Sequence, residues 1–280
     1  MSNDRFGPKK RFGPKKKFRP KKKWGQNFLA SEKILQKLVA SAQIKPMDTV
    51  VEIGAGTGNL TFFLAQTRAK ILAIEKDWEL LERLRKRVGR FKNVKIISAD
   101  ARFFDFEDIK DYKVVGNIPY NITSFILRRL ITQKNPPQTI VLTIQKEVAN
   151  RLISEPGSSQ RGLLTILVQM AGDVQKVIEV GRENFNPVPK VDSAIIKIIP
   201  RAKWGAEQEK FFKFIKIGFS AKRRQIVNNL ASGLAINKKI IYNMLEQAKI
   251  NPLSRAEDLA IDNWKKIYAI VKKQNVKKQN

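Results

Sequence analysis

The chain has 280 residues, enough to bury a sizeable core, and its 42% hydrophobic content is typical of a globular protein. Its 55 lysines and arginines against 25 aspartates and glutamates give a net charge of +30, which favours a nucleic-acid partner over an anionic membrane surface. The lack of cysteine and histidine excludes disulfides, thiolate or imidazole metal sites and an imidazole base. The sequence has neither an apolar run long enough to span a membrane nor the apolar core of a signal peptide, so we expect a cytoplasmic protein.

A basic repeat opens the chain. Residues 1–24 hold eleven lysines and arginines and one aspartate, so this tail carries +10 and the other 256 residues carry +20. A six-residue pattern recurs at 5–10, 11–16 and 17–22, and its Gly-Pro breaks and like charges predict a disordered segment. Two functions remain open: its phenylalanines stack on unpaired bases, or the tail is a nonspecific electrostatic anchor.

A strand, a glycine turn and a helix come next. Ser31 is a candidate N-cap for a helix over 31–39, and residues 49–53 form a β-rich run that leads into the glycines of 54–58. The glycines let the backbone approach a ligand, and the helix that starts near Leu60 brings an electropositive N-terminus. The G-x-G-x-G spacing departs from the dinucleotide pattern, which disfavours a nicotinamide dehydrogenase and suits a ligand without a pyrophosphate.

Three further strands each end on a polar side chain. The runs 70–74, 94–99 and 112–116 are followed by Glu75, Asp100 and Asn117, and a helix is expected over 77–88. Glu75 lies 21 residues after Gly54, where a carboxylate holds a ribose diol. A cap or surface role is the alternative for each carboxylate alone. Their alignment with the glycine turn along one edge of a parallel sheet favours a cofactor site.

The stretch Asn117-Ile118-Pro119-Tyr120 joins an amide, a proline-stiffened turn and an aromatic ring where a buried strand stops. The amide oxygen and a carbonyl of the turn can accept hydrogen bonds from the two N–H groups of an exocyclic amine, while the ring of Tyr120 offers a stacking face. These parts suit a flat molecule that carries an exocyclic amine, although such a turn alone is more often only a turn.

The remaining pattern closes the sheet and then changes character. We expect a helix over 123–131, a strand over 139–144, helices over 145–153 and 163–170, and an antiparallel hairpin of 175–180 with 194–199. From about residue 201 the chain is lysine-rich and helical, which indicates a second domain. Lys222, Arg223 and Arg224 there are either a solvated face or a phosphate-contacting surface.

Taken together, the sequence resembles the small-subunit ribosomal RNA adenine N6-dimethyltransferases. The segments that carry the resemblance are GQNFL (25–29), EIGAGTG (52–58), NIPYN (117–121), QKEVA (145–149), PVPKVDS (187–193) and FSAKRR (219–224). The resemblance implies an α/β fold: a Rossmann-like class I methyltransferase sheet with a C-terminal antiparallel hairpin over 25–200, and a small all-helical RNA-binding domain over 201–280. It also implies S-adenosylmethionine as cofactor and a monomer that needs no metal or membrane.

The same resemblance implies roles for individual residues. The cofactor contacts it implies are Asn27, Leu29, Gly54, Gly56, Glu75, Asp100 and Asn117. Glu75 would take the ribose hydroxyls and Asp100 the cofactor's adenine amine. Asn117, Ile118, Pro119 and Tyr120 would hold the target adenine. Phe185 resembles the residue that covers the other face of that base, or is an ordinary core aromatic. Lys222, Arg223 and Arg224 would contact RNA.

The implied activity is N6-dimethylation of adenosines, two adjacent ones near the 3′ end of 16S rRNA, during small-subunit biogenesis. The alternatives are the sister methylase of 23S rRNA, of the macrolide-resistance type, and a non-catalytic RNA-binding factor on the same scaffold. QKEVA and FSAKRR favour the small-subunit enzyme. The sequence departs from the family pattern in its basic tail and at Arg102, where an apolar residue is expected after Asp100 and Ala101.

Overall fold

The structure of the protein, a computed structural model, describes residues 25–201 and 203–277. The tail predicted at 1–24 lies outside these residues. Among the described residues, no helix combines the length and apolarity that crossing a membrane requires.

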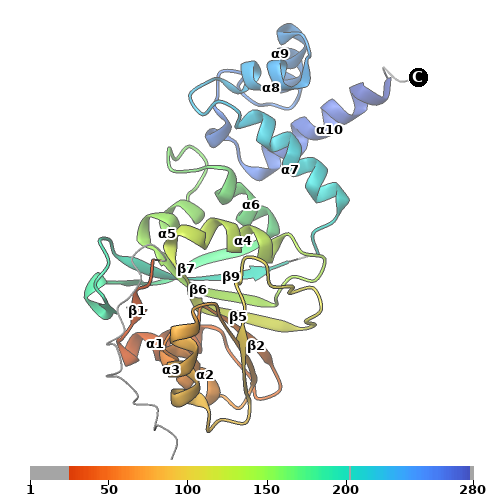
Figure 1. Ribbon diagram of the computed structural model, residues 1–280. Coiled ribbons are helices and arrows are strands. Elements are labelled where there is room, and N and C mark those ends of the chain that lie inside the picture. Colours follow the sequence, from red (N-terminus) through yellow and green to blue (C-terminus); the bar gives the residue numbers. More distant parts are fainter. Residues whose placement is uncertain (1–24, 202, 278–280) are drawn as a thin grey trace, which may run out of the picture.

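A seven-stranded sheet forms the centre of the molecule, with the strand order β4-β3-β2-β5-β6-β9-β7 (Figure 1). The strands are β2 (Thr49–Ile53), β3 (Lys70–Glu75), β4 (Val94–Ser98), β5 (Tyr112–Asn117), β6 (Thr139–Gln145), β7 (Gly172–Val180) and β9 (Ser193–Pro200). Strands β4, β3, β2, β5 and β6 pair in parallel, and β9 is antiparallel to both β6 and β7. The predicted hairpin is therefore confirmed, with β9 inserted between β6 and β7.

Helices cover both faces of this sheet (Figure 1). They are α1 (Glu32–Ser41), α2 (Asn59–Ala65), α3 (Trp78–Val88), α4 (Thr123–Ile131), α5 (Lys146–Leu152) and α6 (Leu163–Ala171). Successive side chains of a strand point to opposite faces, so Val51 packs in the cluster with α4, α5 and α6, and Val50 in the cluster with α1 and α2. Because these strands are buried on both faces of the sheet, their sequences are nearly continuous apolar runs.

Four more helices follow the sheet and stack beyond α4, α5 and α6 (Figure 1). They are α7 (Ala206–Gly218), α8 (Ile226–Leu234), α9 (Lys238–Gln247) and α10 (Ile261–Lys277). These helices bury an apolar cluster of their own, which includes Phe214 and Trp264. Ile166 of α6 belongs to this cluster and Phe212 of α7 to the cluster of the sheet, so the two cores interlock. The domain boundary near residue 201 stays a prediction.

A second, two-stranded sheet was not predicted. It pairs β1 (Phe28–Leu29) with β8 (Phe185–Asn186) in antiparallel register, so that Leu29 lies opposite Phe185. Short 3-10 turns, η2 (Tyr120–Ile122), η3 (Arg182–Asn184) and η4 (Ala256–Asp258), complete the described elements. The pairing brings the segment that precedes α1 against the connection between β7 and β9.

Candidate active site at the strand ends

A cavity that is open to solvent at its mouth lies where β2, β3, β4 and β5 end. The structure brings together every residue expected to contact the cofactor, because the cavity is lined by Asn27, Leu29, Gly54, Gly56, Glu75, Asp100 and Asn117. Ile118, Pro119 and Tyr120 also line it. Phe185 and the three cations at 222–224 lie elsewhere.

The glycine turn after β2 forms one wall of the cavity. Gly54 and Gly56 adopt φ angles of +75° and +58°, a left-handed conformation that side chains other than glycine rarely take. A Cβ atom on Gly56 would also lie 3.1 Å from the ring of Phe28. The turn therefore brings bare backbone to the cavity wall, as the glycine pattern predicted.

Glu75 ends β3 as a buried carboxylate held by backbone donors. Its oxygens accept hydrogen bonds from the N–H groups of Gly56, Lys76 and Asp77 at 2.8, 2.9 and 2.8 Å. A carboxylate has about four acceptor positions, so capacity remains for a hydroxyl donor. Burial raises the pKa of Glu75, and the N–H groups of Asp77 and Gly56 counteract part of that rise.

Glu52 is a second buried carboxyl at the cavity, on β2. It is 1% exposed, and neither of its oxygens accepts a hydrogen bond of normal geometry from the described residues. Burial raises its pKa to about 8, and the charge of Glu75 adds to the rise, while the nearby hydroxyl and N–H of Thr61 oppose it. Glu52 is thus largely protonated at neutral pH.

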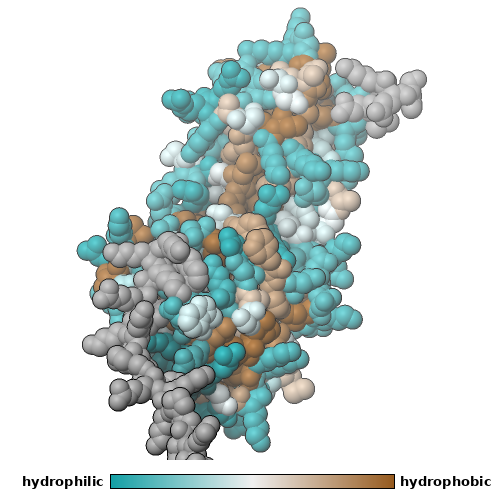
Figure 2. All heavy atoms as spheres, viewed as in Figure 1, coloured by the Kyte–Doolittle hydropathy of each residue, from teal (hydrophilic) through white to brown (hydrophobic). Residues whose placement is uncertain are grey.

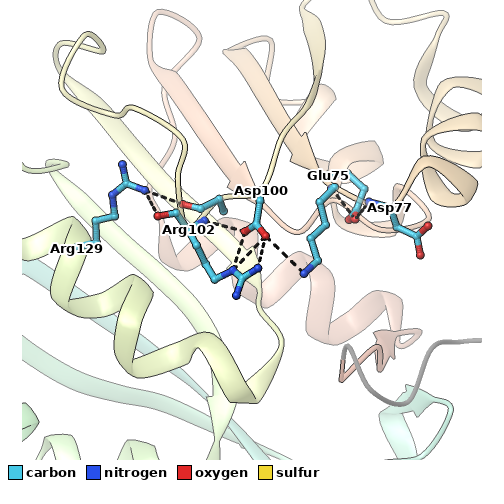
Figure 3. A network of polar contacts seen from close by, with 7 residues as sticks. Glu75, Asp77, Asp100, Arg102 and Arg129 are labelled. Carbon is cyan, nitrogen blue, oxygen red and sulfur yellow. Dashed lines mark hydrogen bonds and ion pairs between the residues drawn. The ribbon is translucent and has the colours of Figure 1, made fainter.

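Asp100, after β4, is held by cations, as Figure 3 shows. Arg102 contacts both of its oxygens through Nε at 3.1 Å and donates from Nη2 to Oδ2 at 2.6 Å. Lys76 Nζ lies 3.7 Å from Oδ2. The Arg102 hydrogen bond is the main cause that lowers the pKa of Asp100 to about 2. Arg102, where the sequence departs from the family pattern, therefore contacts Asp100, a residue predicted to bind the cofactor directly.

The segment 25–29 is tied across the cavity by polar contacts that the sequence did not reveal. Gln26 Nε2 donates to Asp77 Oδ2 at 2.8 Å, and Asn59 Nδ2 donates to the Leu29 carbonyl at 2.9 Å. Asn117 Nδ2 donates to the Asn27 carbonyl, also at 2.9 Å. The GQNFL motif thus acts as a strap that connects α2, α3 and β5.

The contact of Asn117 with this strap also orients its amide. Because Nδ2 is engaged with Asn27, Oδ1 is the atom of the side chain that remains to accept a donor in the cavity. Tyr120 lies half-buried beside it, and its hydroxyl shares a 2.6 Å hydrogen bond with Ser193 Oγ on β9. Burial raises the pKa of Tyr120, so the ring stays neutral.

Phe185 does not face the cavity. Its ring is 2% exposed and packs with Leu29, Leu35 and Val180 in the cluster on the α1 and α2 side. Pairing of β8 with β1 turns this ring into the core, as in the alternative interpretation, and stacking of Phe185 on a bound base stays a prediction.

The cations at 222–224 lie in the loop between α7 and α8. Arg223 and Arg224 are exposed, and Lys222 Nζ donates to the Ser159 carbonyl at 2.7 Å. Lys222, Arg151 and Glu147 line a groove, and Glu147 also lines a neighbouring groove with Lys146, Arg182, Lys190 and Asp192. Asp192 precedes Ser193, the partner of Tyr120, so the grooves lead toward the cavity.

The residues at the strand ends fit S-adenosylmethionine. The bare glycine backbone leaves room for a ligand, Glu75 suits ribose hydroxyls, and Asp100 is an acceptor for an adenine amine. Among the described residues, no group of histidine, cysteine, aspartate and glutamate side chains is arranged to hold a metal ion.

Comparison with known proteins agrees with this geometry. Residues 17–273 match the family described as ribosomal RNA adenine dimethylase. The ribosomal RNA small subunit methyltransferase A of Dehalococcoides mccartyi strain CBDB1 is 39% identical over 250 residues, 87% of this chain and 85% of the relative. The protein of the same description from Clostridium botulinum strain ATCC 19397 is 36% identical over 251 residues, 87% of this chain and 90% of the relative.

Two solved structures share the fold over nearly their full length. A dimethyladenosine transferase from Plasmodium falciparum has a TM-score of 0.74 and 29% identity, covering 89% of this chain and 98% of that one. The 23S rRNA methyltransferase ErmE has a TM-score of 0.72 and 26% identity, covering 87% and 98%. The chain therefore belongs to the ribosomal RNA adenine dimethylases, enzymes that transfer methyl groups from S-adenosylmethionine.

Proposed function

We propose that this chain dimethylates N6 of adenosines in 16S rRNA, two adjacent ones near its 3′ end, within the small ribosomal subunit or its precursor. Relatives described as small-subunit methyltransferases match at 39% and 36% identity over 87% of the chain, and this supports the small subunit as substrate. The single observation that carries the chemistry is the oriented amide of Asn117 beside Tyr120 at the cavity.

The proposed chemistry depends on hydrogen-bond acceptors rather than on a strong base. S-adenosylmethionine supplies an electrophilic methyl group when bound. An adenine amine is a weak nucleophile because its lone pair is delocalised into the ring. Asn117 Oδ1 and the Ile118 carbonyl accept hydrogen bonds from the two N–H groups of this amine. These hydrogen bonds favour a pyramidal nitrogen and aim the lone pair of the nitrogen at the methyl group. A chain without histidine is compatible with this mechanism.

The target adenine must leave the RNA stack to reach this site. Tyr120 offers one stacking face, and its hydrogen bond to Ser193 fixes the ring. Stacking by Phe185 stays a prediction, and it requires this ring to leave the core position that it occupies here. Pro119 stiffens the turn that carries the acceptors.

RNA is proposed to lie along the two grooves that lead to Tyr120. Lys222 lines the groove farther from the cavity, with the exposed Arg223 and Arg224 next to it in the chain, and Lys190 and Arg182 line the other groove. On the face seen in Figure 2, hydrophilic residues lie along the edges of the helical part, with a band of apolar residues between them. A monomer in the cytoplasm, where ribosomal subunits assemble, fits this assignment.

Substitution of Asn117 by alanine tests the site. We expect Asn117→Ala to lower methyl transfer by about 100-fold or more, because one acceptor of the amine is removed, while RNA binding is nearly unchanged. Radiolabelled methyl incorporation and an RNA-binding titration measure the two effects. Asn121→Ala is the matched control, since its side chain is exposed in the same turn. Retained transfer by Asn117→Ala would contradict the assigned role.

The choice of ribosomal subunit needs a separate experiment. The shared fold with ErmE keeps 23S rRNA as the alternative substrate. We expect methyl incorporation into isolated small subunits and their precursors and none into large subunits. Incorporation into large subunits alone would support the 23S alternative, and no incorporation together with no binding of S-adenosylmethionine would support a non-catalytic factor.

A further inference from the structure

The carboxylate of Asp100 has no acceptor position left for a new donor. Oδ1 accepts from the backbone N–H of Arg102 at 3.0 Å and from its Nε at 3.1 Å. Oδ2 accepts from Nη2 at 2.6 Å, shares Nε at 3.1 Å and pairs with Lys76 at 3.7 Å. The four hydrogen bonds from Arg102, two of which share Nε, fill the roughly four acceptor positions of a carboxylate, whereas Lys76 at 3.7 Å is an ion pair without a hydrogen bond. An adenine amine that donates to Asp100 must therefore displace one of them.

The side chain of Arg102 is the partner best placed to leave. It is 40% exposed, and an ion pair with this much solvent access is weak and screened by salt. Its guanidinium already lies 5.3 Å from the ring centre of Phe103, an exposed residue, which offers a position away from the carboxylate. By contrast, the backbone N–H of Arg102 is part of the turn and cannot be withdrawn without unfolding it.

That backbone contact would also keep Asp100 in place after the side chain has left. Arg129 Nη1 donates to the carbonyls of Ala101 and Arg102, which fixes the main chain beside Asp100 (Figure 3). Oδ1 keeps its hydrogen bond to the backbone, and Lys76 still balances the charge of the carboxylate. The guanidinium is therefore not needed to orient Asp100, and its main effect is to occupy the acceptor.

We propose that Arg102 is a built-in competitor for the adenine-binding carboxylate: its guanidinium caps Asp100 in the free enzyme, and the adenine amine of the cofactor must displace it. This inference rests on the proposed function only in assigning the adenine amine to Asp100. It makes Arg102 a residue that weakens and tunes cofactor affinity, and it makes that affinity sensitive to salt, because salt weakens the competing ion pair.

Calorimetric titration with S-adenosylhomocysteine measures this competition without requiring turnover. We expect Arg102→Leu to bind roughly two- to fivefold more tightly than the natural chain at low salt, the range that an exposed ion pair provides. The advantage should shrink as salt is raised, since screening then removes the competitor from the natural chain as well. Equal or weaker binding by Arg102→Leu would overturn the proposal and indicate that the guanidinium positions Asp100.

Two controls separate competition from a general effect of charge. Arg85→Leu removes an exposed cation from α3, away from the cavity lining, and is expected to leave the affinity unchanged. The purine analogue of S-adenosylhomocysteine, which lacks the exocyclic amine, should bind equally to the natural chain and to Arg102→Leu. A gain in affinity for this analogue equal to the gain for the adenine form would contradict displacement by the amine.

The same titration distinguishes failure of the inference from failure of the proposed function. Tight binding to the natural chain with no gain in Arg102→Leu refutes only the competition. If neither protein binds S-adenosylhomocysteine, the cofactor site itself is wrong and the inference falls with it.

Discussion

Two carboxyl groups of one cavity have pKa values displaced in opposite directions. Glu52 lies at the bottom on β2, where loss of water raises its pKa to about 8. Asp100 lies at the rim, where the hydrogen bond from Arg102 lowers its pKa to about 2. At neutral pH the cavity therefore holds an ionised acceptor at its rim and a mostly neutral acid at its floor, and the two differ in their effect on stability.

The buried acid should make the protein less stable as pH rises. The folded-state pKa of Glu52, about 8, exceeds the ordinary value of 4.5, so the folded state binds its proton more tightly than the unfolded state. The free energy of unfolding therefore falls as pH rises from about 4.5 to about 8, by roughly 1.4 kcal/mol per pKa unit of difference. Glu52→Gln, which cannot ionise, should remove this part of the fall.

Chemical denaturation at pH 5, 6, 7 and 8 measures the effect of this substitution. The natural chain is expected to lose more stability across the series than Glu52→Gln. Glu246→Gln, an exposed substitution on α9, should follow the natural chain. Parallel stability curves for the natural chain and Glu52→Gln would show that Glu52 is not protonated in the folded state.

At this scale, the sequence could predict which residues gather but not what they contact. Glu75, Asp100 and Asn117 were found because each follows an apolar run, and parallel strands end at one edge. The hydrogen bonds from Arg102 to Asp100 depend on side-chain rotamers, which no sequence pattern encodes. The direction of the Phe185 ring depends on which neighbour β8 pairs with, and this was equally invisible.

At the scale of elements, the long buried strands and amphipathic helices were predictable because their periodicity is strong. The helix expected over 123–131 matches α4 (Thr123–Ile131). The strands β1 and β8 were missed because two residues are too few to show a period, and their pairing is fixed by tertiary contacts. The strap over the cavity depends on this pairing, so its role emerged only from the fold.

A buried amide helps to hold the loop that presents Lys222, Arg223 and Arg224. Asn229 of α8 is 1% exposed, and its Nδ2 donates to the carbonyls of Gly218 at 2.6 Å and Ala221 at 3.0 Å. We expect Asn229→Ala to lower the free energy of unfolding by about 1–3 kcal/mol, because the Gly218 carbonyl loses the Asn229 donor and the Ala221 carbonyl keeps only the N–H of Arg224. The loosened loop should also bind RNA more weakly.

Affinity for S-adenosylhomocysteine separates this local effect from a general loss of structure. It should be unchanged in Asn229→Ala, because the cavity lies at the far strand ends. Asn228→Ala is the matched control, since the side chain of Asn228 makes a weaker, 3.4 Å hydrogen bond, to Gln225 Oε1. Unaltered RNA affinity in a destabilised Asn229→Ala protein would argue against this loop as an RNA contact.

Charge is the property that belongs to the molecule as a whole. The net charge of +30 divides into +10 on residues 1–24 and +20 on residues 25–280, so the rest of the chain is basic without the tail. Binding of a polyanion releases counterions, and affinity therefore falls with salt in proportion to the phosphates neutralised. The tail should then contribute to affinity and salt dependence, whereas catalysis should depend on the cavity.

Deletion of residues 1–23 tests this division. We expect the slope of log affinity against log salt to decrease in magnitude by about 0.7–0.9 for each phosphate that the tail neutralises, with methyl transfer retained at low salt. An inactive truncated protein at low salt would refute the division.

A second variant, with Phe6, Phe12 and Phe18 replaced by serine, keeps the charge of the tail. If it binds RNA as the natural chain does, the tail is an electrostatic anchor; weaker binding with an unchanged salt slope identifies stacking on unpaired bases, because stacking adds affinity without neutralising phosphates.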